Sequence, residues 1–217
     1  MVMVHGALIL TQVMFGGGSV VGKLGVSSFN PMLFALIREA VAGIILFCWA
    51  LYVDGTQHLK SKMDVLLFFL CGLFIFSNQA FFIIGDKLAS PVIASAWQPT
   101  QPVFTLMISL LLGWERLTAL KAMGIAISFG GAAFMVAYGT DFTSQGSLQL
   151  VMGNVFFFLN CLGTSLYVIM AKVMLRRGYP PSTVTAWSYL NGACLMACTA
   201  TALNSSCPVV SVLLCPS

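Results

Sequence analysis

The sequence predicts an all-α fold, a polytopic membrane helix bundle with about seven transmembrane helices. The chain is 59% hydrophobic and only 7% charged, whereas soluble domains carry roughly 25% charged residues. Its charged residues leave long uncharged runs at 1–22, 65–85, 88–114, 122–140, 142–171 and 178–217. Several of these runs reach the ~20 residues that a helix needs to cross a bilayer.

Breakers and charges divide the chain into seven expected spans. Their approximate bounds are 6–26, 31–53, 64–85, 90–113, 118–138, 148–174 and 182–203. Pro31, Pro180 and Pro181 stand where a first helical turn is expected, a position at which the missing N–H costs nothing. The remaining segment, 204–217, is too short to span and is predicted to be a tail.

The lysines and arginines between the spans predict the orientation. With a cytosolic N-terminus, the inner loops hold seven of them: Lys60, Lys62, Arg116, Lys121, Lys172, Arg176 and Arg177. The outer loops hold only Lys23 and Lys87. This distribution follows the positive-inside rule, and we expect the plasma membrane to be the location. Because Lys23 follows the first apolar run instead of preceding it, that run is predicted to be a retained helix, not a signal peptide.

A weak internal repeat appears at a shift of 149 residues. Five residues then match: Leu10, Lys23, Pro31, Gly43 and Leu46 face Leu159, Lys172, Pro180, Gly192 and Leu195. A lysine, a short loop and a helix begun by proline occur in both copies, on opposite sides of the membrane. An inverted repeat of this kind is typical of secondary transporters, whose site lies between the halves.

Composition and motifs argue against several other functions. The aspartates and histidines fall in loops or at span ends, and neither GxSxG nor HExxH occurs, so nucleophilic and zinc mechanisms lack their parts. The net charge of +4 forms no basic patch with interleaved aromatics, so nucleic acid is not an expected partner. We therefore expect no catalytic residues, no metal and no cofactor; a homodimer stays compatible with the sequence.

Arg38 and Glu39 are charged residues inside an expected span, about two turns into it. Intramembrane charges are costly and are by default a functional hypothesis. Adjacent helical residues point about 100° apart, so each of the two side chains needs a partner of its own. The alternative is that both extend to the headgroups at the near end of the helix, and the sequence does not decide between these readings.

The span at 90–113 contains a polar, proline-broken segment. Pro99 and Pro102 each remove a backbone hydrogen bond and are predicted to kink the helix. Gln98 and Gln101, three residues apart, share a face, and Trp97 lies beside it. We expect these side chains to line a water-filled cavity, because irregular backbone at membrane depth is tolerated only in protein or beside water; the alternative is a kink held by interhelical amide bonds.

Two more polar clusters lie in apolar spans. Asn78 and Gln79 follow Ser77 in the third expected helix, and Asn160 shares the sixth with Asn154. Any one such residue is more often a helix-to-helix hydrogen bond than a ligand contact. Together they predict a bundle with a wet interior.

The stretch 89–136 carries a resemblance to a known family. It reads A-S-P-V-I-A-S-A-W-Q-P-T-Q-P-V-F-T, then an apolar run, L-L-G-W-E-R-L and a helix with G-I-A-I-S-F-G-G. This resembles the end of an EamA domain of the drug/metabolite transporter superfamily, including its plant nodulin-like branch. The family's proline in helix 4, its L-x-G-x-E or L-G-E motif and its glycine-rich helix 5 match Pro99 or Pro102, Gly113 with Glu115, and Gly124, Gly130 and Gly131. Arg38 matches an arginine that the family often has in helix 2.

The resemblance implies a ten-helix inverted-repeat transporter fold with two EamA-like repeats. Residues 6–138 correspond to a first five-helix repeat and 148–203 to the first two helices of an incomplete second one. The chain departs from the family in the insertion of Trp114 between Gly113 and Glu115. It also lacks the helix 1 carboxylate of the small multidrug exporters. Glu115 is expected to be a structural loop charge.

These observations predict a transporter of small metabolites, amino-acid-like or drug-like, that works by alternating access. Residues assigned to substrate are Trp97, Gln98, Gln101, Asn78, Gln79, Asn160, Arg38 and Glu39, the last two for binding or proton coupling. The expected partners are a small-molecule substrate and the lipid bilayer. The alternative is a truncated, non-transporting membrane protein that acts only through association with partners; an intramembrane enzyme is a third, weaker reading.

Overall fold

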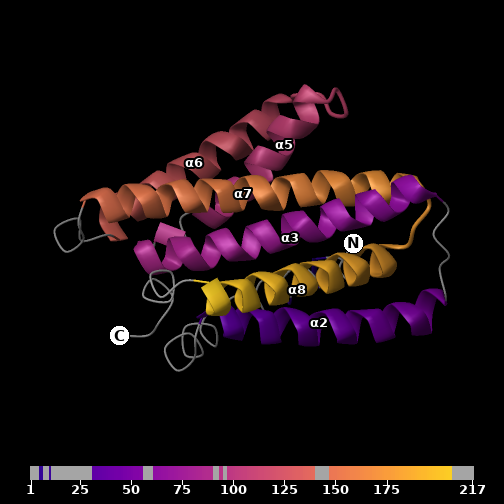
Figure 1. Ribbon diagram of the computed structural model, residues 1–217. Coiled ribbons are helices and arrows are strands. Elements are labelled where there is room, and N and C mark those ends of the chain that lie inside the picture. Colours follow the sequence, from indigo (N-terminus) through magenta and orange to yellow (C-terminus); the bar gives the residue numbers. More distant parts are fainter. Residues whose placement is uncertain are drawn as a thin grey trace.

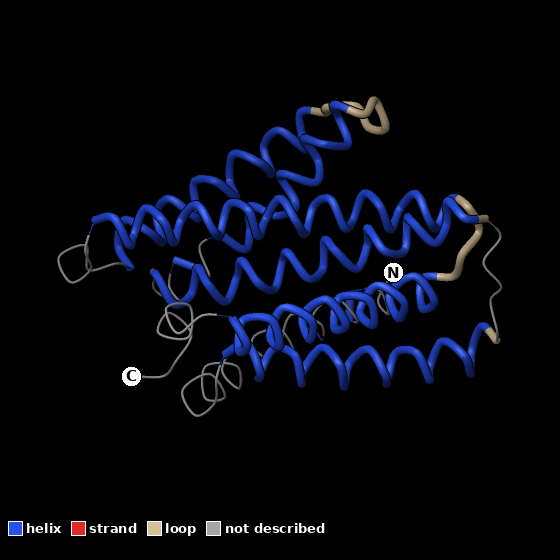
Figure 2. Tube along the Cα trace, in the orientation of Figure 1, coloured by secondary structure: helices blue, strands red, loops and turns tan. Residues whose placement is uncertain are grey.

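The computed structural model describes residues 5–6, 10, 31–55, 61–89, 93–94, 97–139 and 147–206. Its elements are α2 (Pro31–Asp54), α3 (Lys62–Leu88), the 3-10 turn η1 (Gln98–Thr100), α5 (Gln101–Leu111), α6 (Ala119–Gly139), α7 (Ser147–Arg176) and α8 (Pro181–Ser206). Within these ranges all regular structure is helical (Figure 2). The predicted helix bundle is confirmed. The span expected at 6–26 lies almost wholly outside the described residues, as do residues 207–217 of the tail predicted at 204–217; its first three residues continue α8.

Three of the helices are long and apolar enough to cross a membrane: Ala35–Asp54, Lys62–Leu88 and Leu148–Arg176. Gln101–Leu111 and Ala119–Gly131 are shorter apolar helices. Large apolar side chains point outward from these elements, among them Ile45 of α2, which is 63% exposed. Such surfaces need lipid as their solvent. The protein is therefore an integral, multi-pass membrane protein.

The long helices form a row in the order α2, α8, α3, α7, and α5 packs on the remaining side of α7 (Figure 1). Neighbours α2 and α8 are antiparallel, since Asp54 lies beside Thr183 while Ala35 packs with Met196. Helix α8 runs parallel to α3. Residues 31–111 are thus packed against residues 147–206 along four helix pairs, α2 with α8, α3 with α8, α3 with α7 and α5 with α7.

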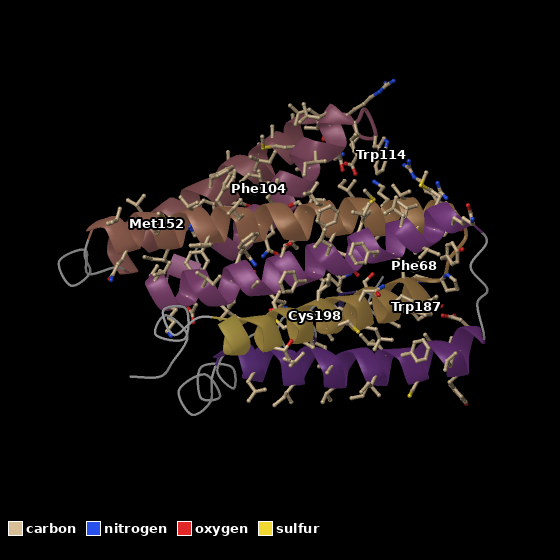
Figure 3. All side chains as sticks on the ribbon, in the orientation of Figure 1. Phe68, Phe104, Trp114, Met152, Trp187 and Cys198 are labelled. Carbon is tan, nitrogen blue, oxygen red and sulfur yellow. The ribbon has the colours of Figure 1, made fainter. Side chains whose placement is uncertain are left out.

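Small residues allow the helices of this row to approach closely. A Cβ on Gly72 of α3 would overlap the side chain of Asn191 and lie 3.1 Å from the backbone nitrogen of Gly192 on α8. Small residues bring about close packing of this kind in membranes, where burial from water does not drive helix association. Beside the contact, Phe68 lies near Trp187 (Figure 3), with ring centroids 6.2 Å apart. The centroid of the Phe68 ring is 5.2 Å from that of Tyr179.

One end of the bundle gathers most of the described ionic contacts, and we call it the charged end. Arg177 donates to Asp64 at 2.6 Å, and the Tyr179 hydroxyl donates to the other oxygen of Asp64 at 2.8 Å. The Asp64 side chain is only 3% exposed. These bonds join the first turn of α3 to the α7–α8 connection, so they tie two segments that are far apart in sequence.

Glu115 lies at the same charged end, after α5. It pairs with Lys121 at 2.7 Å and with Lys172 of α7 at 3.6 Å. The hydrogen bond and positive charge of Lys121, with a smaller contribution from Lys172, hold the pKa of Glu115 below its usual range. Beside it the Arg176 guanidinium lies 4.5 Å from the centre of the Trp114 ring, a cation–π distance. Glu115 thus links the α5–α6 connection to the end of α7.

Candidate functional site

The residues predicted to contact substrate lie at one level of the bundle, beside the middle of α7. We call the set Arg38, Glu39, Asn78, Gln79, Trp97, Gln98, Gln101 and Asn160 the polar belt. Its members lie on α2, α3, the η1 region with the start of α5, and α7. Polar groups at this depth need partners from protein or water, so the hydrogen bonds of each member indicate which of them are available to a ligand.

Asn78 and Asn160 each form hydrogen bonds with the helix that carries the other. The Asn160 amide donates to the backbone carbonyl of Asn78 at 2.6 Å. The Asn78 amide donates to the Thr164 hydroxyl and lies 3.4 Å from the carbonyl of Asn160. This reciprocal pair joins α3 to α7, and Gly163 lets the two backbones approach because it has no Cβ. Their described bonds are those of an interhelical clamp.

The proline-broken segment becomes the η1 turn followed by α5. Pro102 has no N–H to give to the carbonyl of Gln98; the N–H of Gln101 bonds there instead, in the 3-10 pattern. The Trp97 carbonyl is consequently free of that N–H. It accepts from the Thr100 hydroxyl at 2.6 Å and lies 3.5 Å from the Cys161 sulfur. Protein side chains thus satisfy the irregular backbone, which is the condition for such backbone at membrane depth.

Trp97 also bonds to α7. Its indole N–H donates to the Asn154 side chain at 2.9 Å, and Asn154 donates to the Leu150 carbonyl at 2.8 Å. About three turns further along α7, the Ser165 hydroxyl lies 3.1 Å from that of Thr105 and 3.2 Å from the Gln101 carbonyl. Ser165 and Thr105 were not predicted as site residues, because single hydroxyls in apolar helices give no signal of their partner.

Gln98 and Gln101 differ from these residues. The Gln101 amide donates to the Gln98 side-chain oxygen at 3.0 Å, as expected for residues that share a face. Gln98 is exposed and Gln101 is partly exposed. Among the described residues, no bond from these two side chains to another helix is recorded. This amide pair is therefore open to a ligand or to a further helix.

Arg38 and Glu39 have separate environments, as their positions on α2 require. The Arg38 guanidinium is exposed and donates to the Gln79 side chain of α3. The Glu39 side chain is 1% exposed, and neither of its oxygens has a hydrogen-bond partner within the described structure. The structure thus gives Arg38 a neutral partner, and among the described residues it gives Glu39 no hydrogen-bond partner.

The polar belt is divided between three helix contacts. One joins Arg38 to Gln79, a second joins Asn78 to Asn160, and the third joins Trp97 to α7. Asn78 and Gln79 are adjacent in α3, which connects the first two contacts. The structure brings the members to one level; it does not bring all of them around one described cavity.

The L-L-G-W-E motif ends α5. Gly113 has a φ of 69°, in the left-handed region that side chains other than glycine rarely adopt. The turn carries Trp114 and Glu115 toward α7, where they meet Arg176 and Lys172. The inserted Trp114 therefore belongs to the contact between the α5–α6 connection and α7. Among the described residues, no group of three or more His, Cys, Asp or Glu side chains is placed to hold a metal ion.

Comparison with known proteins agrees with this architecture. The chain is 26% identical to WAT1-related protein At3g53210 of Arabidopsis thaliana over 89% of its length and 58% of that protein. It is 23% identical to the uncharacterized transporter YyaM of Bacillus subtilis over 75% of its length and 53% of that protein. It spans a little over half the length of these curated relatives, and no solved structure matches it significantly. The EamA-like transporter family matches residues 3–137, and the chain belongs to that family.

Proposed function

We propose that the protein moves a small solute, amino-acid-like or drug-like, across the membrane by alternating access between two inverted halves. The observation that carries this proposal is the split polar belt. Six of its eight members are exposed or partly exposed, and four of these, Arg38, Gln79, Gln98 and Gln101, have no side-chain bond to α7 among the described residues, whereas Asn78 and Trp97 do. The relatives named as transporters support the class of function. In this proposal these four side chains contact the solute, while Asn78, Asn160 and Trp97 hold the helices that carry them.

An uptake screen in reconstituted vesicles tests the proposal. The purified chain is inserted into liposomes and offered radiolabelled amino acids and small aromatic or amphipathic solutes. The gene product with any further helices encoded downstream is tested in parallel, since the chain spans only 53% and 58% of the two relatives named above. Uptake above protein-free vesicles is the expected result. Correct insertion without uptake in both forms would favour the alternative, a membrane protein that acts through association with partners.

The amide pair gives the sharpest prediction about the site. Gln98→Ala and Gln101→Ala are expected to abolish uptake of the solute that the screen identifies, and to change the melting temperature little, because neither amide holds another described helix. Asn160→Ala is the matched comparison. It removes the bond to Asn78 and should lower stability by roughly 0.6–2 kcal/mol, with activity reduced only in proportion to the folded protein.

Melting temperature and uptake are measured on the same preparations of these variants. Loss of stability with normal activity per folded molecule in the two glutamine variants would contradict the assignment of the amide pair to the solute.

The orientation is proposed with the charged end in the cytosol. Arg176 and Arg177 at the end of α7, Lys172 and Lys121 gather there, which supports the assignment from the positive-inside rule. A reporter fused after residue 60 should be cytosolic, and one placed at residue 143 should be external. Protease protection or thiol labelling on intact cells reads both positions. The same side for both would overturn the orientation or the helix count.

A further inference from the structure

Glu39 is the buried acid that the contacts described so far do not explain. It lies in α2, roughly 12 Å along the axis from Pro31 at 1.5 Å per residue, on the side that packs against α8. Its side chain is 1% exposed, and both carboxyl oxygens lack a hydrogen-bond partner within the described structure. An ionised carboxylate in such a place loses its hydration without recovering it from protein bonds. The neutral acid avoids that loss.

The groups around Glu39 make a proton the fitting ligand. Arg38 is adjacent in sequence, but its guanidinium is bonded to Gln79 of α3. On α8 the Tyr189 phenol is near enough to interact electrostatically with both Arg38 and Glu39. The charged residues of α3, at its two ends, are Lys62, Asp64, Asp86 and Lys87, at least seven positions along the chain from Gln79. No second carboxylate is recorded at this level of the described helices.

A sodium ion fits the same place poorly. Sodium sites in membrane transporters use backbone carbonyls from unwound helices. Helices α2, α3 and α8 are continuous at this level, so their carbonyls are bonded within the helices. One carboxyl group and one phenol supply too few oxygens for a metal ion, which takes six or more when it is a hard cation. A proton needs only the carboxyl oxygen.

We propose that Glu39 is a proton-binding site, occupied in this conformation, whose proton exchanges with water when α2 and α8 move apart. On release, the O–H bond of the Glu39 carboxyl breaks, the proton passes to water, and the carboxylate is left with Arg38 as the nearest positive charge. The inference deepens the proposed function, because alternating access would expose this acid to each side in turn. The solute would then be coupled to the pH gradient.

Infrared spectroscopy of the purified full chain in nanodiscs tests the site without any solute. The wild type is expected to show the carbonyl stretching band of a protonated carboxylic acid at neutral pH. The band should shift in D₂O and disappear reversibly at alkaline pH. It should be absent from Glu39→Gln and present in Glu115→Gln, since Glu115 is an ion-paired carboxylate at the charged end. Glu39→Asp keeps an acid and should move the band, which guards against a Glu39→Gln variant that fails to fold.

Several outcomes would overturn the proposal. They are a wild type without the acid band, a band unaffected by Glu39→Gln, and a band that neither shifts in D₂O nor titrates. In vesicles that transport, a pH gradient should drive the wild type to an inside-to-outside solute ratio several-fold above one. In Glu39→Gln this ratio should fall to about one. Absence of all transport would contradict the proposed function, while the infrared band still decides whether Glu39 holds a proton.

Discussion

Arg177→Ala is expected to destabilise the folded protein by about 1–3 kcal/mol. The substitution leaves Asp64 with a side chain that is 3% exposed and without its cationic partner. Removing one member of a fully buried ion pair costs about 3–5 kcal/mol. The loss of a partner for a buried polar group costs about 1–3 kcal/mol. Because Arg177 itself is 42% exposed and Tyr179 still donates to Asp64, the smaller range applies.

Lys121→Ala is the matched control for Arg177→Ala. It also removes a lysine or arginine partner of a carboxylate at the charged end, but Lys121 and Glu115 are 38% and 32% exposed. Exposed pairs contribute about 0.2–1 kcal/mol. Unfolding free energies in mixed micelles measure both variants. The double variant Asp64→Asn with Arg177→Ala should recover part of the loss, since no buried charge then remains. Equal effects of the two single variants would contradict the role given to Asp64.

Gly72→Ala is expected to cost about 1–3 kcal/mol, the range for overpacking a well-packed contact. The added Cβ would overlap Asn191 and approach the backbone of Gly192, so α3 and α8 must separate. Alanine is also a better helix former than glycine by up to about 1 kcal/mol, which reduces the net loss but does not reverse it. Thermal unfolding in detergent should show a lower melting temperature for this variant.

Gly124→Ala separates packing from helix propensity. Nothing lies within 4 Å of a Cβ at Gly124 of α6, so only the propensity term operates there. This variant should melt at the wild-type temperature or slightly above it. If Gly72→Ala melted like Gly124→Ala, the close approach of α3 to α8 would not describe the protein in its membrane.

The sequence predicted the helices well because their signals are local. Apolar runs and prolines placed α2, α3, α7 and α8 within a few residues of their observed bounds. Pro102 lies where the structure has a 3-10 turn followed by a new helix. These features depend on residues within one or two turns of each other, so a single chain is enough to read them.

Which helices meet could not be predicted in the same way. Arg38 and Gln79 are 41 positions apart, and Asp64 and Arg177 are 113 apart. In a membrane, apolar side chains cover a helix on all sides, so hydrophobic periodicity does not identify the packed face. The burial of Glu39 beside α8 likewise depends on which face of α2 is packed. The sequence marked Arg38 and Glu39 equally, and only the packing separates an exposed cation from an enclosed acid.

The η1 turn is a bending point between α7-bound Trp97 and helix α5. In an unbroken helix, tilting one half against the other sacrifices backbone hydrogen bonds. Here Pro102 has already removed one, and the Trp97 carbonyl is held by the Thr100 hydroxyl and the Cys161 sulfur instead. Thr100 belongs to the turn itself, so its bond to the Trp97 carbonyl does not tie α5 to α7. The Cys161 contacts and the bonds of Ser165 to Thr105 and Gln101 do, so a tilt of α5 against α7 must break them. Kinks at proline are recognised bending points. A tilt of α5 at this point would cost only its described bonds to Ser165 and Cys161, while the segment before it stays anchored to α7 through Trp97 and Asn154.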